Sequence, residues 1–504
     1  MRKKRSSKKA PCHTRTGVIS VTSRGVGFVS TESTAEDILI PQGSLNTALH
    51  GDTVEIELAP ARRGERQSGT VREVLSRKKM QFVGTVVEKD GTLHVQPDER
   101  RFYTSITLPP RTGIAPNTKV LVAITWERGD ARPRGTVIET IGKKGLHDVE
   151  MRAILLDKGI ATGFPLQVEN EAAKILKKST ITEADFATRR DFRNVPTCTI
   201  DPIDAKDFDD ALSFVENGPD VFEIGIHIAD VSHYVREGSA LDEEARQRGI
   251  SVYLVDRTIP MLPEILSNDL CSLNPGEDKR AFSAVFTMDA NGDVLDRWFG
   301  RTLIRSQKRF SYESAQETMS TGQGIFAREL HVLNSIAQKL KRRRHEKGAI
   351  DFEEDEVRFE LDAHGVPTRV VRKVRLETHK LIEEFMLLAN RAVAERIQEL
   401  EKKTGRAHPF IYRIHDRPNS EKIEELALFL RAIGHDLAIN DGSVSSKDLN
   451  ALFRKMEGEA AEGLVKTAAI RAMAKAIYTT KNIGHYGLAF RHYTHFTSPI
   501  RRYP

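Results

Sequence analysis

The sequence predicts an α+β protein in which two small β-barrels in tandem precede a much larger mixed body. Three observations support this fold class. Residues 15 to 145 consist of short alternating segments broken by Gly, Asn, Asp and Pro, which is typical of strands and turns. The pattern within that stretch repeats after about 65 residues, as tandem domains do. Beyond residue 150, apolar residues recur mainly at helical spacing.

The two barrels are predicted from matching segments. TGVISVTSRGVGFVS and GDTVEIEL are echoed by FVGTVVEKDGTLHVQP and NTKVLVAITW, and each copy has an apolar strand ending in proline, DILIP and SITLP. RGVGFVS resembles the Gly-Phe-rich strand of cold-shock domains, which are OB-type barrels that bind single strands. We therefore expect OB-type (cold-shock-like) domains at residues 15–75 and 80–145. Four aromatic residues are candidates either for base stacking or for the barrel cores: Phe28, Phe82, Phe102 and Tyr103.

Composition excludes several classes of protein. With 29% charged and 39% hydrophobic residues, the chain resembles an ordinary soluble protein. No apolar run approaches the roughly 18 residues that span a bilayer. The basic start, MRKKRSSKKA, lacks the apolar segment of a secretory signal, so residues 1–14 are predicted to be a basic disordered tail. The three cysteines form no Cys-x-x-Cys pair, which argues against a disulfide framework or a zinc site and favours a reducing cytoplasm.

The net charge of +6 is unevenly distributed. Residues 1–150 carry +8 and the remainder carries −2. A basic patch attracts polyanions through Coulomb forces and counterion release. On charge, the N-terminal part is therefore the expected contact for a nucleic acid, and the alternative is a basic face that serves solubility alone.

The large body is predicted to begin with a hairpin and continue with helices. ALSFV and VFEIGIHIADVSHYV flank a turn at ENGPD. Four amphipathic helices are expected in ELHVLNSIAQKLKRRRHEK, HKLIEEFMLLANRAVAERIQEL, SEKIEELALFLRAIG and EGLVKTAAIRAMAKAIY. We expect residues 150–504 to form one large catalytic domain of mixed α+β structure.

Five aspartates crowd the stretch TIDPIDAKDFDDALSF: Asp201, Asp204, Asp207, Asp209 and Asp210. If they are ionised and partly buried, their repulsion costs on the order of several kcal/mol unless a cation offsets it. Hard oxygen ligands select Mg²⁺, Mn²⁺ or Ca²⁺, and neither the EF-hand spacing nor a Walker A loop is present. The run therefore predicts a carboxylate-bound metal that acts on a phosphodiester. A solvated acidic turn is the alternative.

The last residues, FRHYTHFTSPIRRYP, gather cationic and aromatic side chains that suit phosphates and bases. Ser498 followed by Pro499 predicts the start of a helix, with Ser498 as N-cap and Pro499 at the first helical position. Arg501 would then lie in the first turn, where anions are favoured. The alternative is that these arginines are ordinary surface residues.

Taken together, these segments resemble the RNB family, the ribonuclease II and ribonuclease R exonucleases. TIDPIDAKDFDDAL is similar to the family signature, and IPMLPEILSNDLCSLNPGEDKRAFS, RRRHEKGAIDF, HKLIEEFMLLAN, PFIYRIHDRP and HFTSPIRRYP follow in the family's order. The segment GEDKRAFS is more similar to the ribonuclease R branch of the family than to the ribonuclease II branch. The resemblance implies two N-terminal OB-type (cold-shock-like) β-barrels followed by a large mixed α+β RNB catalytic domain. It also implies a Mg²⁺-dependent hydrolytic 3′→5′ exoribonuclease that degrades single-stranded RNA processively to nucleoside 5′-monophosphates.

Carried over by motif position, the resemblance assigns five residues to the chemistry. Asp201 and Asp210 would bind Mg²⁺ directly, with Mn²⁺ as a substitute, and Asp207 would support the metal site. Loss of Asp209 would stop cleavage and leave RNA binding intact. Arg501 would contact the scissile phosphate and stabilise charge in the transition state.

Three aromatic residues are assigned to the RNA. Tyr253 and Phe359 would stack on bases near the 3′ end, and Tyr312 would line the channel. A core position is the alternative for each of them. The expected partner is single-stranded RNA, with no membrane, and the protein is expected to be a cytoplasmic monomer.

The chain ends at Pro504, inside the SPIRRYP motif, whereas family members continue through the catalytic domain into an S1 domain. We therefore expect an RNB domain that is incomplete at its C-terminus, without the S1 domain, and a form that is poorly active or unstable. Two other functions remain as alternatives. One is a catalytically silent RNA-binding protein of the same fold, against which the full set of aspartates argues. The other is a metal-dependent DNA nuclease or phosphatase.

Overall fold

The computed structural model describes residues 14–31, 37–60, 66–110, 112–350, 356–439 and 442–504. The chain divides into two compact units, Met1–Gly163 and Phe164–Pro504, and each is described by itself. The predicted basic tail, residues 1–14, lies outside the described residues except for its last position. Among the described residues, no helix is both long and apolar enough to cross a membrane.

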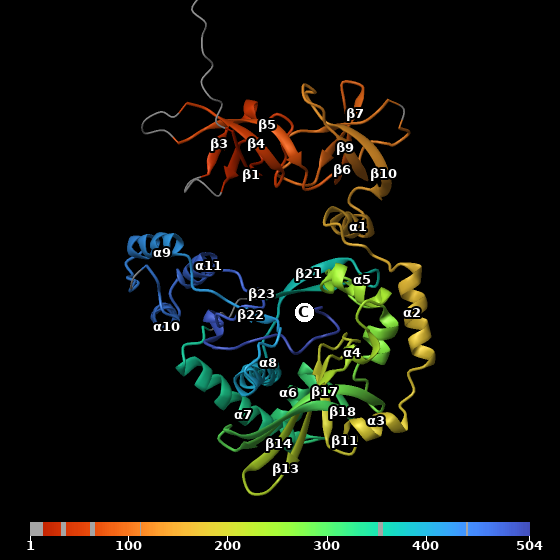
Figure 1. The fold of residues 1–504 in the computed structure, drawn as a ribbon, viewed down its shortest axis with the longest axis vertical. Coiled ribbons are helices and arrows are strands. Elements are labelled where there is room, and N and C mark those ends of the chain that lie inside the picture. The colour runs from red at the N-terminus through yellow and green to blue at the C-terminus, as the bar shows by residue number, and fades with distance from the viewer. Residues whose placement is uncertain (1–13, 32–36, 61–65, 111, 351–355, 440–441) are drawn as a thin grey trace, which may run out of the picture. The chain divides into compact units, whose positions relative to one another are not determined.

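The first half of the N-terminal unit is a five-stranded sheet of order β3-β2-β1-β4-β5 (Figure 1). A parallel bridge between Leu39 and Ser68 joins its two ends. Along β4 the buried side chains of Val54 and Ile56 alternate with more exposed ones, as expected for a strand with one face on a core. The strands are β1 (Thr14–Val21), β2 (Gly27–Ser30), β3 (Ile38–Ile40), β4 (Thr53–Leu58) and β5 (Gly69–Ser76).

The second half repeats this topology as a closed barrel of order β10-β8-β7-β6-β9. Because the barrel is closed, its order can also be read as β8-β7-β6-β9-β10, which corresponds to β3-β2-β1-β4-β5 of the first sheet. This correspondence confirms the predicted pair of OB-type barrels. Phe82 and Phe102 are buried and stack edge to face, so the core interpretation is right for both. The elements are β6 (Gln81–Lys89), β7 (Thr92–Pro97), β8 (Ile106–Thr107), β9 (Thr118–Thr125) and β10 (Arg134–Lys143), followed by helix α1 (His147–Asp157).

The C-terminal unit is built on a mixed seven-stranded sheet of order β11-β18-β17-β14-β13-β12-β19. The predicted hairpin is confirmed as β13 paired with β14, with Asp210 opposite Ile228. Strand β12 pairs in parallel with β19, which sets Asp201 beside Ser311. The strands are β11 (Arg190–Phe192), β12 (Thr197–Asp201), β13 (Asp210–Glu216), β14 (Val221–Ala229), β17 (Asp278–Asp289), β18 (Val294–Arg305) and β19 (Lys308–Ser311).

Helices cover both faces of this sheet, so its central strands are apolar on both sides. One core joins the sheet to α6 (Tyr312–Thr321), α7 (Ala327–Glu346) and α8 (Glu377–Thr404). The other core joins it to α2 (Leu166–Lys177), α5 (Ala240–Arg248) and a π-helical segment at Ile265–Leu270. In Figure 1 the sheet lies at the bottom of the view, with α7 and α8 to its left and α2 to its right. Two further short helices flank strands of the sheet: α3 (Glu183–Thr188) precedes β11, and α4 (Val231–Tyr234) follows β14.

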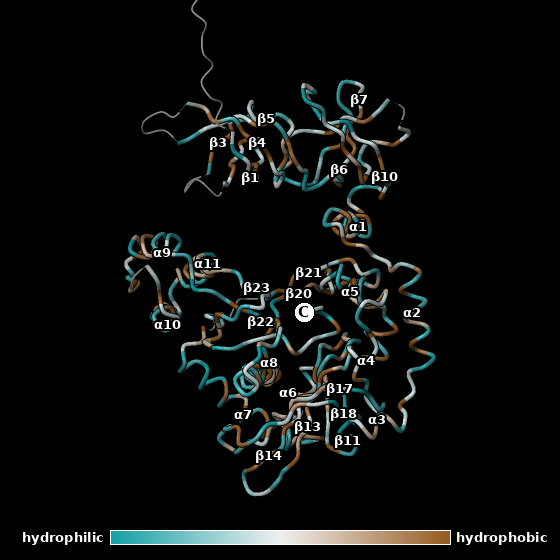
Figure 2. Tube along the Cα trace, viewed as in Figure 1, coloured by the Kyte–Doolittle hydropathy of each residue, from teal (hydrophilic) through white to brown (hydrophobic). Residues whose placement is uncertain are grey.

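The remaining elements form smaller substructures. Helices α9 (Ser420–Ala432), α10 (Ser446–Met456) and α11 (Glu462–Ala472) share a core of their own, and hydrophobic and hydrophilic stretches alternate along them (Figure 2). The described part of this unit also has three two-stranded ribbons: β15 (Val252–Tyr253) with β16 (Thr258–Ile259), β20 (Val357–Leu361) with β21 (Pro367–Arg372), and β22 (Tyr412–Ile414) with β23 (Ile477–Thr479).

Two predicted elements differ from the structure. The helix expected in EGLVKTAAIRAMAKAIY ends at Ala472, because Met473 is extended and residues 477–479 pair with β22 instead. The helix expected from Pro499 is a single turn, in which the N–H groups of Arg501 and Arg502 donate to the Ser498 carbonyl. Ser498 has φ of 65°, a left-handed conformation that is not that of a helix N-cap.

Candidate active site

The acidic run connects two adjacent strands of the large sheet. Strand β12 ends at Asp201 and β13 begins at Asp210, so both carboxylates lie at the same end of one strand pair. Asp201 is 6% exposed, and its Oδ2 has no hydrogen-bond partner among the described residues. Burial, reinforced by the charge of Asp210, raises the pKa of Asp201, and burial raises the pKa of Asp210. These carboxylates are therefore held close together at the cost of mutual repulsion.

Asp209 is the most buried of the aspartates in the run, at 2% exposure. Its Oδ1 accepts a hydrogen bond of 2.9 Å from the Ile500 N–H. Its Oδ2 lies 3.1 Å from the Arg501 Nε as an ion pair but is not aligned for a hydrogen bond. Burial raises the pKa of Asp209 to about 7, although the Arg501 charge opposes that rise.

Arg501 reaches the acidic run from the turn at the end of the chain. Its Nε donates to Asp207 Oδ2 at 2.9 Å, and its Nη2 donates to the Asp207 carbonyl at 3.0 Å and to Oδ1 at 3.2 Å. This forked contact fixes the guanidinium plane. The guanidinium carbon lies 6.0 Å from the centre of the Tyr253 ring. The structure thus brings together Arg501, Asp207, Asp209 and Tyr253 from three distant parts of the sequence.

Other residues, with no role predicted from the sequence, hold the acidic loop in place. Ser272 Oγ donates to the Lys206 carbonyl and accepts from the Phe208 N–H, each at 2.9 Å. Arg309 Nη2 donates to the carbonyls of Pro202 and Ile203, each at 2.7 Å. Backbone carbonyls that need distant donors leave no trace in a sequence pattern. Ser272 lies within the family-like segment LSNDLCSLNPGEDKR, which is the one signal available for it.

Asn390 of α8 holds the segment that leads to Arg501. It is 3% exposed, and its Oδ1 accepts from the N–H groups of Phe496 at 2.8 Å and Thr497 at 3.0 Å. Its Nδ2 donates to the Tyr493 hydroxyl at 3.2 Å. A single buried carboxamide therefore satisfies three polar groups of this segment. The predicted helical periodicity placed Asn390 on a helix but could not give its partners.

The three predicted aromatic residues lie in different surroundings. Tyr253 is 55% exposed beside Arg501. Tyr312 begins α6 next to Ser311 and stacks on His379 with ring centres 3.8 Å apart and planes 11° apart. Burial, with the charges of Asp210 and Asp201, raises the pKa of the Tyr312 hydroxyl, which places it within the electrostatic reach of the acidic site.

Phe359 lies on the β20–β21 ribbon, apart from the sheet that carries the carboxylates. It is 36% exposed. The turn of this ribbon approaches the loop that follows Tyr253, since a Cβ added at Gly365 would lie 3.7 Å from Asp256 Cβ. The exposed surfaces of Tyr253 and Phe359 thus belong to neighbouring ribbons.

The carboxylates fit a hard divalent cation in their chemistry. Asp201 Oδ2 and Asp209 Oδ2 are buried oxygens without a hydrogen-bond donor, and the repulsion between Asp201 and Asp210 would fall if a cation lay between them. Within the described ranges, no group of three or more His, Cys, Asp or Glu side chains is already arranged around a common metal position. The candidate metal ligands, Asp201 and Asp210, come from the ends of two strands. The Asp207 carboxylate instead accepts hydrogen bonds from Arg501.

Three known domain families match parts of this chain. The RNB domain matches residues 189–504, the ribonuclease B OB domain matches residues 17–74, and a cold shock domain matches residues 94–165. Because the RNB match covers more than half of the chain, this protein belongs to the RNB family.

Curated relatives include ribonuclease R proteins from several bacteria. The chain is 36% identical to ribonuclease R of Thermotoga maritima and 33% identical to ribonuclease R 1 of Lactococcus lactis, each over 97% of its length. It is 33% identical to ribonuclease R of Escherichia coli over 95% of its length. The chain spans 69, 61 and 59% of these three relatives, respectively.

Solved structures have the same fold. Mycoplasma genitalium RNase R in complex with ribose methylated single-stranded RNA superposes with a TM-score of 0.88 at 27% identity, covering 97% of this chain and 77% of that one. Yeast Ssd1, a pseudonuclease, superposes with a TM-score of 0.71 at 20% identity, covering 97% of this chain and 67% of that one. The second likeness concerns the fold alone.

Proposed function

We propose that this protein is a Mg²⁺-dependent 3′→5′ exoribonuclease that hydrolyses single-stranded RNA processively to nucleoside 5′-monophosphates, with Mn²⁺ as a substitute metal. The observation that carries the proposal is the meeting of the acidic loop with the final turn. There, Arg501 donates hydrogen bonds to Asp207, and the Ile500 N–H donates to the buried Asp209. A cation at Asp201 and Asp210 and an arginine beside it are what phosphodiester hydrolysis requires.

Asp201 and Asp210 are the proposed holders of the metal. A bound Mg²⁺ would supply a Lewis acid for the phosphate oxygens and a water of lowered pKa. Asp207 keeps the Arg501 guanidinium in a fixed plane, so this side chain can meet a phosphate oxygen without reorienting and stabilise its developing charge.

Asp209 is the proposed acceptor of a proton. Its Oδ2 has no hydrogen-bond partner among the described residues, and a pKa near 7 suits general base catalysis at neutral pH. The attacking water would form a new P–O bond and give its proton to Asp209 Oδ2. The bond from phosphorus to the 3′-oxygen of the shortened chain would break, and that oxygen would take a proton from solvent.

Recognition of the RNA is assigned to stacking and charge. Tyr253 and Phe359 present exposed aromatic surface, and Tyr312 stacks on His379 within reach of the acidic site. Stacking on aromatic side chains tolerates any base, so the enzyme should accept many sequences. Residues 1–150, which comprise the basic N-terminal tail and the two barrels, carry an excess charge of +8 and would bind the strand through its phosphates. We also expect a cytoplasmic monomer, and light scattering during size-exclusion chromatography measures the oligomeric state.

The test uses 5′-labelled single-stranded RNA with Mg²⁺ or EDTA. Shortening from the 3′ end that requires Mg²⁺ and disappears in Asp209→Asn supports the proposal. Asp204→Asn is the matched control, because Asp204 belongs to the same loop but is exposed. Binding without shortening favours a silent RNA-binding protein, and equal cleavage of DNA favours a general nuclease.

A further inference from the structure

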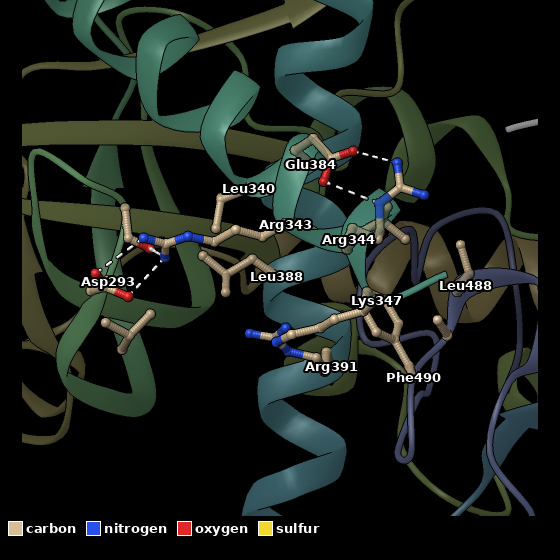
Figure 3. A pocket seen from close by; sticks show the side chains of 14 residues that line it. Asp293, Leu340, Arg343, Arg344, Lys347, Glu384, Leu388, Arg391, Leu488 and Phe490 are labelled. Atoms are coloured by element: carbon tan, nitrogen blue, oxygen red, sulfur yellow. Dashed lines mark hydrogen bonds and ion pairs between the residues drawn. The ribbon is translucent and has the colours of Figure 1, made fainter. Parts of the chain in front are cut away.

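A pocket of about 200 Å³ lies in the C-terminal unit, away from the residues of the candidate active site (Figure 3). It is enclosed by the end of α7, the middle of α8, the β17–β18 turn at residues 292–294, and the segment at residues 488–490. Four of its lining side chains are cationic and two are anionic. The pocket therefore has an excess of two positive charges.

Both anionic side chains are already paired. Arg343 binds Asp293 through two contacts of 2.8 and 3.1 Å. Arg344 binds the buried Glu384 through both of its carboxylate oxygens. Figure 3 shows these two ion pairs as dashed lines on opposite sides of the pocket. The other two lining cations are Lys347 and Arg391, and Arg391 also forms an ion pair with Glu395, which lies outside the lining.

Arg391 has an unsatisfied donor. Its Nε is buried and has no hydrogen-bond partner among the described residues. This Nε forms an ion pair with Glu395 Oε1 at 3.5 Å, and the other oxygen of Glu395 pairs with Arg297 at 3.1 Å. A buried guanidinium N–H without a hydrogen bond is unfavourable, so an anion that accepted from this Nε would be stabilised.

We propose that this pocket binds a phosphate monoester dianion. The lining carries more cationic than anionic side chains, which favours an anion, and a guanidinium is the side chain best suited to phosphate oxygens. The cavity is too small for an oligonucleotide and has room for one phosphate group with part of its substituent. Phe490, whose ring centre lies 5.5 Å from the Arg391 guanidinium carbon, offers a flat apolar surface to that substituent.

A ligand in this pocket would also affect the position of the segment that carries Arg501. Arg391 follows Asn390 directly on α8, and Asn390 binds the backbone at Phe496 and Thr497. Phe490 precedes that same backbone in the sequence. A ligand held between Arg391 and Phe490 would therefore tie α8 to the segment that carries Arg501.

The experiment measures binding by calorimetry, without RNA and with EDTA, so that it does not depend on cleavage or on a metal. Inorganic phosphate, adenosine 5′-monophosphate and uncharged adenosine are titrated in separate arms. We expect both phosphates to bind and adenosine not to bind. Equal affinities would identify the phosphate group alone as the ligand, whereas tighter binding of the nucleotide that Phe490→Leu reduces would identify a nucleotide.

Variants assign the binding to this pocket. Arg391→Gln should weaken phosphate binding roughly tenfold or more, the scale of one charge-assisted hydrogen bond. Arg396→Gln, an exposed position of the same helix, should change it less than about twofold. Lys347→Gln, at an exposed residue, repeats the test without disturbing the core. Arg501→Gln shows whether the active site contributes. Absence of phosphate binding, or binding unchanged in both Arg391→Gln and Lys347→Gln, would overturn the proposal.

Discussion

The contact between Asn390 and the C-terminal segment gives the most direct test of how this site is built. Replacing Asn390 by Leu keeps a side chain of similar volume but removes the acceptor for two backbone N–H groups and the donor to Tyr493. Thr497 is buried and Phe496 is partly buried, so neither N–H is fully compensated by water. The loss should cost about 2–4 kcal/mol, at roughly 1–3 kcal/mol for a buried unsatisfied group and about 1 kcal/mol for a partly exposed one.

Hydrogen exchange measures this cost locally, which suits a chain with two compact units that need not unfold together. A loss of 2–4 kcal/mol corresponds to exchange that is roughly 30- to 1,000-fold faster in the peptide containing Phe496 and Thr497, since about 1.4 kcal/mol is a factor of ten. Peptides from β6 and β9, in the other unit, should be unchanged. Cleavage of RNA should fall because the segment that leads to Arg501 is held less firmly, while binding of RNA persists.

Two variants separate the contributions. Asn390→Asp keeps the acceptor oxygens, so protection at Phe496 and Thr497 should be largely retained. Tyr493→Phe removes only the bond to the carboxamide Nδ2 and should accelerate exchange far less than Asn390→Leu. If Asn390→Leu leaves exchange in residues 496–497 at the level of the original protein, the reasoning from buried hydrogen bonds is wrong.

Four further outcomes are expected. Arg501→Lys keeps the charge but loses the fork on Asp207, so cleavage of labelled RNA should fall at least roughly tenfold with RNA affinity little changed; equal loss of affinity would contradict this. In EDTA, Asp209 of the folded form keeps its proton up to a pH of about 7, whereas in the unfolded form it releases the proton near pH 4. The stability that this group contributes is therefore present at low pH and is lost as the pH rises through 7. Melting temperatures at pH 5.5 and 8 check this, and Asp209→Asn should flatten the difference. Mg²⁺ should raise the melting temperature at pH 8 more in the original protein than in Asp201→Asn, and equal effects would argue against a metal there. Tyr312→Ala removes the stack on His379 and should slow cleavage of the 3′-terminal nucleotide more than it weakens binding of long RNA.

Much of the fold could be predicted from local pattern. The repeat of strands, the hairpin at ALSFV and the helices α7, α8 and α9 each carry a periodicity that their own residues determine. The end of α11 could not be predicted, because residues 477–479 pair with β22, more than 60 residues earlier in the sequence. Tertiary pairing overrode local helix propensity there. The Ser498-Pro499 pair likewise predicts a helix N-cap, whereas Ser498 has a φ of 65° that its neighbouring residues do not predict.

In the candidate site, too, some features are visible in the sequence pattern and others depend on contacts between distant residues. Crowded carboxylates beside apolar strands are visible in the sequence, and the structure places Asp201 and Asp210 at adjacent strand ends. The contacts of Ser272 and Asn390 are side chain to backbone, and such pairs have no characteristic spacing. The chemical roles of the aspartates, of Arg501 and of the aromatic residues stay predictions until the variants are measured.

The distance along the chain between the two halves of the site has a consequence for its biosynthesis. Asp207 and Arg501 are 294 residues apart, and Asp209 and Ile500 are 291 apart. At about 5–20 residues per second, a ribosome needs roughly 15–60 s to travel that interval. During that time the emerging polypeptide holds its acidic loop without the arginine. The contacts that complete the candidate site can therefore form only after residue 501 has been synthesised.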